Sequence, residues 1–124
     1  MYSIETINLT CCFGQFYAVK ELSLQIEVGA FYGFLGPNGA GKSTTIKMLT
    51  GLLKPTEGTI RILGFNMDHQ NIEIKKHIGV VPEDLSLFER LTGSEYLHFV
   101  GNMYGLNSSI ILNRSRELLE VMDL

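Results

Sequence analysis

The chain has 124 residues, enough for one small domain with a hydrophobic core. Its apolar content of 45%, charged content of 19% and net charge of −3 are typical of a globular protein and give no reason to expect nucleic-acid binding. No apolar run approaches the roughly 18 residues of a membrane span, and no basic, apolar leader precedes Tyr2, so a cytoplasmic protein is expected.

The first part of the chain predicts antiparallel strands. Residues 1–13 read as a strand with imperfect alternation, and residues 14–17 as a turn. Residues 18–28 alternate strictly from Leu22 onward, which is typical of a half-buried antiparallel strand. Residues 31–35 form a short apolar run, which predicts a buried parallel strand.

The next elements alternate between helix and strand. A helix is predicted at residues 43–50, because apolar positions recur there and Gly51 follows as a natural C-terminal cap. Residues 53–58 are rich in turn formers, and residues 59–63 predict another strand. A short polar helix is expected at residues 71–77.

The last third predicts one brief strand and then helices. Residues 78–81 read as a strand that Pro82 ends. A loop of unusually apolar content follows, and a helix with Ser94 as its N-cap is expected up to Gly105. Residues 107–124 predict a last helix.

One motif carries the chemistry of the chain. The pattern G-x-x-x-x-G-K-[ST] for phosphate binding is complete in the residues Gly36, Pro37, Asn38, Gly39, Ala40, Gly41, Lys42, Ser43 and Thr44. Its glycines permit φ > 0 and bring backbone N–H groups close to a phosphate. Lys42 offers a positive charge to the β- and γ-phosphates, and Ser43 a hydroxyl to Mg²⁺. The order strand, loop, helix adds a helix N-terminus to the site, and the alternative is a chance match in a glycine-rich turn.

The cysteines and histidines predict no further site. Adjacent cysteines rarely bridge each other, so Cys11 and Cys12 are expected to be one core residue and one surface thiol. The three histidines are scattered and read as ordinary helix or loop residues: His69, His77 and His98.

The residues from Gly33 to Gly36 and on to Lys54-Pro55-Thr56-Glu57-Gly58-Thr59-Ile60 resemble the nucleotide-binding domains of ABC transporters. The sequence of this stretch is similar to that of the exporter-type subgroup, whose members pair with separate ABC-2 membrane subunits. The resemblance covers the whole chain. It implies an α/β fold with a P-loop NTPase-like core, that is a RecA-like parallel sheet, and an N-terminal antiparallel β subdomain. The implied division is residues 1–30 for the β subdomain, 31–83 for the core up to the Q-loop, and 84–124 for the start of a helical subdomain.

The resemblance also implies ATP and Mg²⁺ as ligands and gives roles to two further residues. Phe13 falls in the family's aromatic loop, where a ring stacks on adenine; from the residues alone, a core aromatic is the alternative. Glu83 falls where the family places its Q-loop glutamine, which contacts Mg²⁺ and senses the γ-phosphate. A carboxylate can bind Mg²⁺ and could accept a proton, so Lys42 and Glu83 are the candidate catalytic residues. A solvated loop glutamate is the alternative for Glu83.

Partners are likewise implied by the resemblance. Leu85, Leu87 and Phe88 lie where the family docks the coupling helix of its membrane permease, although these side chains could instead fold back onto the following helix. The parent protein would work as a homodimer or heterodimer of ATPase domains, peripheral on the inner face of the cell membrane.

Four motifs of a complete ABC ATPase do not occur before Leu124: the Walker B aspartate, the catalytic glutamate, the Ser-Gly-Gly signature and the switch histidine. The sequence therefore looks like the N-terminal part of such an enzyme, expected to bind nucleotide without turnover. The alternatives are a regulatory nucleotide-binding module and a soluble ABC protein outside transport.

Overall fold

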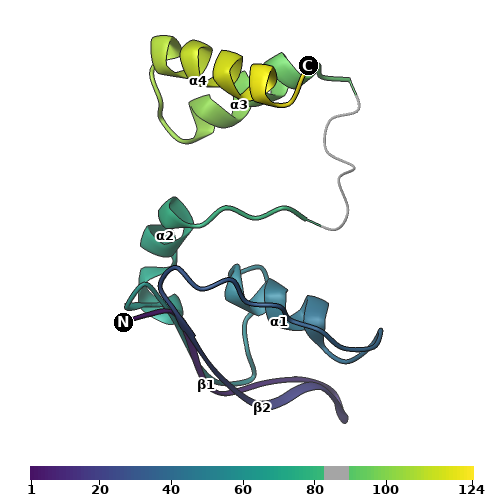
Figure 1. Ribbon diagram of the computed structural model, residues 1–124. Helices are drawn as coiled ribbons and strands as arrows, with labels where there is room; N and C mark the ends of the chain where they lie inside the picture. Colours follow the sequence, from purple (N-terminus) through teal and green to yellow (C-terminus); the bar gives the residue numbers. More distant parts are fainter. Residues whose placement is uncertain (83–89) are drawn as a thin grey trace. The chain divides into compact units, whose positions relative to one another are not determined.

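The computed structural model describes residues 1–82 and 90–124 (Figure 1). The chain divides into two compact units, Met1–Val80 and Val81–Leu124. The elements in chain order are β1 (Tyr2–Phe13), β2 (Phe16–Glu27), α1 (Lys42–Leu49), β3 (Glu57–Ile62), β4 (Phe65–Asn66), α2 (Met67–His77), α3 (Gly93–Met103) and α4 (Ser108–Val121).

The first unit is built on a four-stranded sheet of order β2-β1-β3-β4, in which every neighbouring pair is antiparallel. Strands β1 and β2 form a long hairpin that runs from the pair Tyr2 and Glu27 to the pair Phe13 and Phe16 at its tip. Leu22, Leu24 and Ile26 are half-buried and alternate with exposed polar residues. The predicted antiparallel β subdomain is therefore confirmed.

Helices α1 and α2 cover the sheet with their apolar residues. The core cluster takes side chains from three strands and both helices: Leu9, Cys11, Val19, Met48, Leu49, Ile60, Ile62, Met67 and Ile74. Cys11 is buried in this cluster, Cys12 is half-buried, and both thiols are free. The expectation of a core cysteine is therefore met by Cys11, whereas Cys12 is half-buried and is not the surface thiol that was expected.

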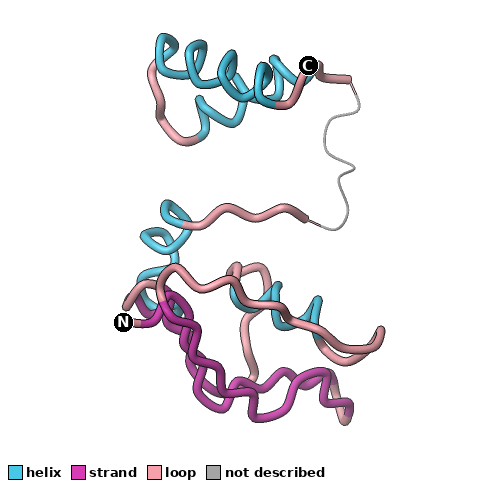
Figure 2. Tube along the Cα trace, viewed as in Figure 1, coloured by secondary structure: helices cyan, strands magenta, loops and turns pink. Residues whose placement is uncertain are grey.

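The strands expected at residues 31–35 and 78–81 are wrong for this structure. Both segments are drawn as loop in Figure 2 and have no strand assignment. A β-strand exists through hydrogen bonds to a neighbouring strand, and within residues 1–82 and 90–124 neither segment has such a partner. Phe31 and Leu35 are consequently exposed instead of buried. The parallel sheet of the expected core is thus not formed within the described part of the chain.

Helix α2 begins earlier than the sequence predicts. The Asn66 side chain caps it by accepting a hydrogen bond from the Asp68 N–H at 2.8 Å. Gln70 then has non-helical backbone angles (φ −129°, ψ 30°), which kink the helix. The expected helix at residues 71–77 is therefore the part after the kink, and a capped first turn precedes it.

The described part of the second unit contains two helices, α3 and α4. Thr92, and not the predicted Ser94, caps α3: its hydroxyl accepts from the Glu95 N–H, and the Glu95 carboxylate accepts from the Thr92 N–H. This reciprocal capping box satisfies two donors, which a lone Ser94 could not do. The two helices approach each other closely where Gly101 of α3 meets Ile111 of α4.

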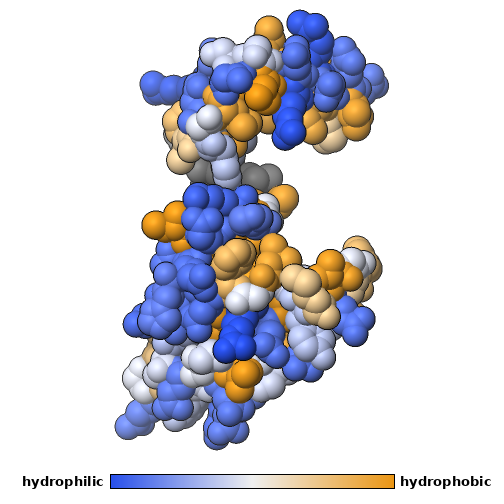
Figure 3. Space-filling model, turned by 90° about the vertical axis from the view of Figure 1, so that its left-hand side faces the viewer, coloured by the Kyte–Doolittle hydropathy of each residue, from blue (hydrophilic) through white to orange (hydrophobic). Residues whose placement is uncertain are grey.

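No helix among the residues that the structure describes is long and apolar enough to cross a bilayer. Apolar side chains are nevertheless visible on the surface of both units in Figure 3.

Candidate functional site

The phosphate-loop motif forms a tight turn that leads directly into α1. The Ala40 N–H donates to the Pro37 carbonyl at 3.2 Å, which closes the turn. Gly39 and Gly41 both have positive φ, 82° and 89°, and only glycine adopts such angles without strain. Gly39 and Gly41 therefore leave the loop backbone uncovered, because neither residue has a Cβ.

Gly41 also fixes the loop to the hairpin. A Cβ at this position would lie 2.3 Å from the Ala18 carbonyl oxygen and 3.0 Å from Val19 Cγ2, both in β2. The start of α1 is thus pressed against the strand that carries the aromatic tip of the hairpin.

The N-terminus of α1 is available to an anion. Gly41 is the N-cap of α1 and provides no side-chain hydrogen bond to it. The first turn of α1, which lies within the described residues, contains no acidic residue. The first N–H groups of a helix have no partner within the helix and carry the positive end of its dipole. The Lys42 ammonium folds back and donates to the Gly36 carbonyl. Backbone donors and one cation therefore gather at the same loop, as a phosphate group requires.

These residues fit Mg²⁺ only as a metal that accompanies a nucleotide. Ser43 is exposed in the first turn of α1 and offers one hydroxyl. In the described ranges, no group of three or more His, Cys, Asp or Glu could hold a metal ion. Mg²⁺ keeps several waters and takes oxygen ligands from phosphates, so one hydroxyl beside a bound triphosphate is a chemically suitable contribution.

Phe13 lies at the tip of the β1–β2 hairpin and is 54% exposed. The alternative of a core aromatic therefore does not hold in this structure. Phe16 and Tyr17, from the start of β2, are exposed beside the same turn, and the Lys20 ammonium lies 5.4 Å from the Tyr17 ring centroid. The tip thus offers apolar ring faces on which a flat base can stack.

Four of the sequence candidates lie outside the described residues: Glu83, Leu85, Leu87 and Phe88. His77 has a structural place: its Nδ1 lies 2.7 Å from the Glu73 carbonyl, and its ring stacks on Phe65.

Thr45, to which the sequence motif gives no role, is bonded to the phosphate loop. It is only 1% exposed, and its hydroxyl donates to the Gly41 carbonyl at 2.8 Å. The spacing of Thr45, Met48 and Leu49 on one helical face could have indicated that Thr45 is buried.

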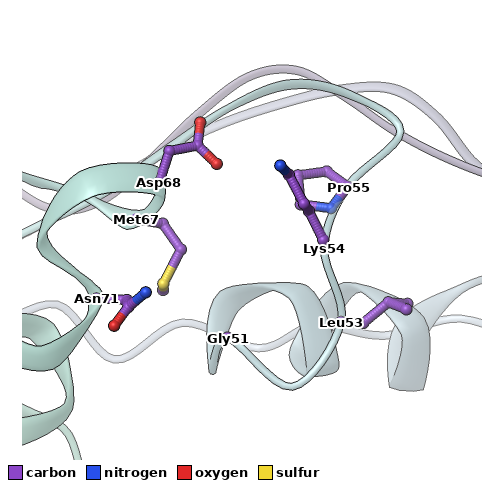
Figure 4. A pocket seen from close by; sticks show the side chains of 7 residues that line it. All are labelled: Gly51, Leu53, Lys54, Pro55, Met67, Asp68 and Asn71. Carbon is purple, nitrogen blue, oxygen red and sulfur yellow. The ribbon is translucent and has the colours of Figure 1, made fainter.

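A separate pocket of about 270 Å³ lies at the opposite end of α1 from the phosphate loop (Figure 4). Gly51 and Pro55 belong to the turn after α1, and Met67 and Asn71 to α2. Lys54 and Asp68 extend to the same side of the pocket. Because none of its residues belongs to the phosphate loop, this pocket is distinct from the candidate nucleotide site.

The chain is similar to known proteins of one family. The sequence model of the ABC transporter family matches residues 19–123. The linearmycin resistance ATP-binding protein LnrL of Bacillus subtilis is 38% identical, over 98% of this chain and 39% of its own length. The daunorubicin/doxorubicin resistance ATP-binding protein DrrA of Streptomyces peucetius is 39% identical, over 95% of this chain and 36% of its own length. The chain thus spans well under half the length of these curated relatives.

Solved structures agree with this placement. An ATP-binding subunit of an ABC transporter superimposes with a TM-score of 0.81 at 30% identity, over 94% of this chain and 49% of that structure. A dimeric ATP-binding cassette in a post-hydrolysis state, bound to ADP and Pi, superimposes with a TM-score of 0.83 at 27% identity, over 98% of this chain and 57% of that one. With its phosphate loop, its hairpin and these similarities, the chain belongs to the ABC transporter family.

Proposed function

We propose that this chain is the nucleotide-binding part of an ATP-binding subunit, and that the whole protein couples ATP binding and hydrolysis to export through a membrane permease. The observation that carries the proposal is the phosphate loop, in which Gly39 and Gly41 expose backbone donors, Lys42 adds a cation and α1 adds its N-terminus. Relatives whose names refer to drug resistance support the export role.

The proposed residue roles follow from this geometry and from the family resemblance. Lys42 and the loop N–H groups, from Gly36 to Thr44, hold the phosphates, and Phe13 stacks on the base. Ser43 and Glu83 would provide oxygen ligands for Mg²⁺, which when bound would neutralise phosphate charge. Glu83 is included on the resemblance alone.

The proposed assembly rests on the family as well. The proposed division is residues 1–30 for the antiparallel β subdomain, 31–83 for the core and 84–124 for the start of the helical subdomain, although β3 and β4 join the sheet of the first part. The permease would contact the loop that contains Leu85, Leu87 and Phe88, and two ATPase domains would pair as a homodimer or heterodimer. Such a protein works in the cytoplasm, on the inner face of the cell membrane.

Equilibrium binding tests the proposal directly. The 124-residue chain is titrated calorimetrically with ATP and Mg²⁺, and separately with adenosine, which lacks the phosphates. We expect saturable ATP binding, clearly tighter than adenosine binding, and no release of inorganic phosphate above a Lys42→Ala control. Equal affinity for ATP and adenosine would show that the loop does not hold phosphates. Phosphate release above the control would show that the chain hydrolyses ATP by itself.

A further inference from the structure

We propose that Thr45 is a positioning residue for phosphate binding, whose buried hydroxyl orients the peptide between Gly41 and Lys42. This inference rests on the proposed function, since it concerns the same phosphate loop. It assigns a role to a residue that follows the binding motif and does not itself contact the nucleotide.

Thr45 donates two hydrogen bonds to one carbonyl. The Gly41 oxygen accepts from the Thr45 N–H at 2.9 Å and from the Thr45 hydroxyl at 2.8 Å. Thr45 is 1% exposed, so water does not compete for this carbonyl from the hydroxyl side. Thr45 also borders a pocket of about 280 Å³ together with Leu24 and Ile26 of β2, which places it on the sheet-facing side of α1.

The consequence follows from peptide geometry. The C=O and N–H groups of a trans peptide point in opposite directions, and no cis peptide occurs in the described chain. Since the Gly41 carbonyl is directed along the helix toward Thr45, the Lys42 N–H points the other way, back into the phosphate loop. Two bonds restrain this orientation more tightly than the helical bond alone, so the donor is aligned before a phosphate arrives.

Gly41 makes such restraint necessary. Its left-handed backbone, with φ 89° and ψ 10°, has no side chain to limit rotation of the following peptide. The close approach of Ala18 restrains Gly41 from one side, and the Thr45 hydroxyl restrains its carbonyl from the other. The two contacts together define the angle at which the loop enters α1.

The chain contains a control at the other end of α1. Thr50, the C-cap residue of α1, donates its N–H to the Ile46 carbonyl at 2.9 Å, and its hydroxyl to the Ile46 and Lys47 carbonyls at 2.9 Å and 3.2 Å. Like Thr45, it bonds the carbonyl four residues earlier through both groups, but it is half-buried and remote from the loop. Thr50→Val therefore removes a threonine hydroxyl that bonds to the same helix without touching the phosphate site.

The test compares ATP and adenosine binding to Thr45→Val, Thr45→Ser and Thr50→Val in the 124-residue chain. Thr45→Val should weaken ATP binding about three- to tenfold, because one neutral hydrogen bond is lost. Adenosine binding should not change. Thr45→Ser, which keeps the hydroxyl, and Thr50→Val should bind ATP within about twofold of the parent chain. Thermal melts show which variants are folded. If Thr45→Val is not folded, Thr45→Ala replaces it, since it also lacks the hydroxyl.

Each other outcome has a definite meaning. Equal ATP affinity of Thr45→Val and Thr50→Val would overturn the positioning role. A Thr45→Ser variant as weak as Thr45→Val would overturn it too, because packing of the methyl group and not the hydroxyl would then be decisive. A parent chain that does not prefer ATP to adenosine would overturn the proposed function itself.

Discussion

Gly41 of the phosphate loop lies so close to Ala18 of β2 that a Cβ at Gly41 would stand 2.3 Å from the Ala18 carbonyl oxygen. Backbone atoms cannot yield as a flexible side chain can, so this contact ties the loop to the hairpin. Glycine is therefore required at position 41 for two independent reasons. Its backbone φ is 89°, and there is no space for a Cβ beside the Ala18 carbonyl.

Gly41→Ala is therefore expected to displace the start of α1. The left-handed backbone alone costs an alanine about 1–2 kcal/mol, and the clash with Ala18 adds to it. Gly39→Ala is the matched control: it has a φ of 82°, yet nothing lies within 4 Å of its Cβ position. Denaturant melts should show a larger loss of stability for Gly41→Ala, and equal losses would show that the contact with Ala18 is not restrictive.

Lys42→Ala should weaken ATP binding by roughly 2–4 kcal/mol, the scale of removing one partner of a charge-assisted contact. Calorimetry measures the loss. Lys47→Ala, in the last turn of the same helix, removes an equal charge away from the loop and should leave the affinity nearly unchanged. Similar losses in the two variants would indicate that only net charge matters.

Phe13→Ala should cost about 1–3 kcal/mol of ATP binding, the usual worth of base stacking on an aromatic ring. Phe13→Tyr keeps the ring and should bind as the parent does. Phe16→Ala removes the ring opposite Phe13 at the hairpin tip and tests whether the effect belongs to Phe13. A Tyr variant as impaired as the Ala variant would contradict stacking.

Gly101→Ala should destabilise the α3–α4 pair, because its Cβ would stand 2.6 Å from Ile111 Cγ1. Overpacking of this kind costs about 1–3 kcal/mol. Gly93→Ala, whose Cβ would meet only Leu119 at 3.7 Å, should be neutral or stabilising. Thermal melts compare the two, and Gly101→Ala should cost less in an Ile111→Ala background, which lacks Cγ1, Cγ2 and Cδ1. An undiminished cost in that background would mean that Ile111 does not cause the clash.

The capping box of α3 should make its stability depend on pH. Hydrogen bonds from the backbone N–H and then from the hydroxyl of Thr92 lower the pKa of Glu95 below its ordinary value of 4.5. Because the folded pKa is lowered, the stabilisation is fully present above the ordinary value and is lost as the pH falls through the lowered one. Glu95→Gln can still cap the helix but does not titrate. The difference in melting temperature between parent and variant should change only in this acidic range, and a constant difference would refute the coupling.

The sequence by itself determined the chemistry of the loop and the order of most elements. The nine-residue motif, the alternation from Leu22 onward and the helical spacing after Lys42 depend on neighbours along the chain, so local rules suffice to predict them. The same rules predicted strands at residues 31–35 and 78–81 that are not formed. Apolar content can be read from a sequence, but a strand needs partner strands. No strand pairs with these segments in the described ranges.

Tertiary structure alone decided what each local element contacts. The sequence left Phe13 open between core and surface, and the exposed hairpin tip excludes the core. It gave no reason to relate Gly41 to Ala18, because 23 residues separate them and only the packing of α1 on β2 brings them together. Thr44 and Thr45 are adjacent in one helical turn, and helical spacing indicates which of them is buried but not what its hydroxyl contacts. Their difference is the direction in which each side chain leaves the helix, and only Thr45 faces the sheet, where burial preserves its bond to the loop.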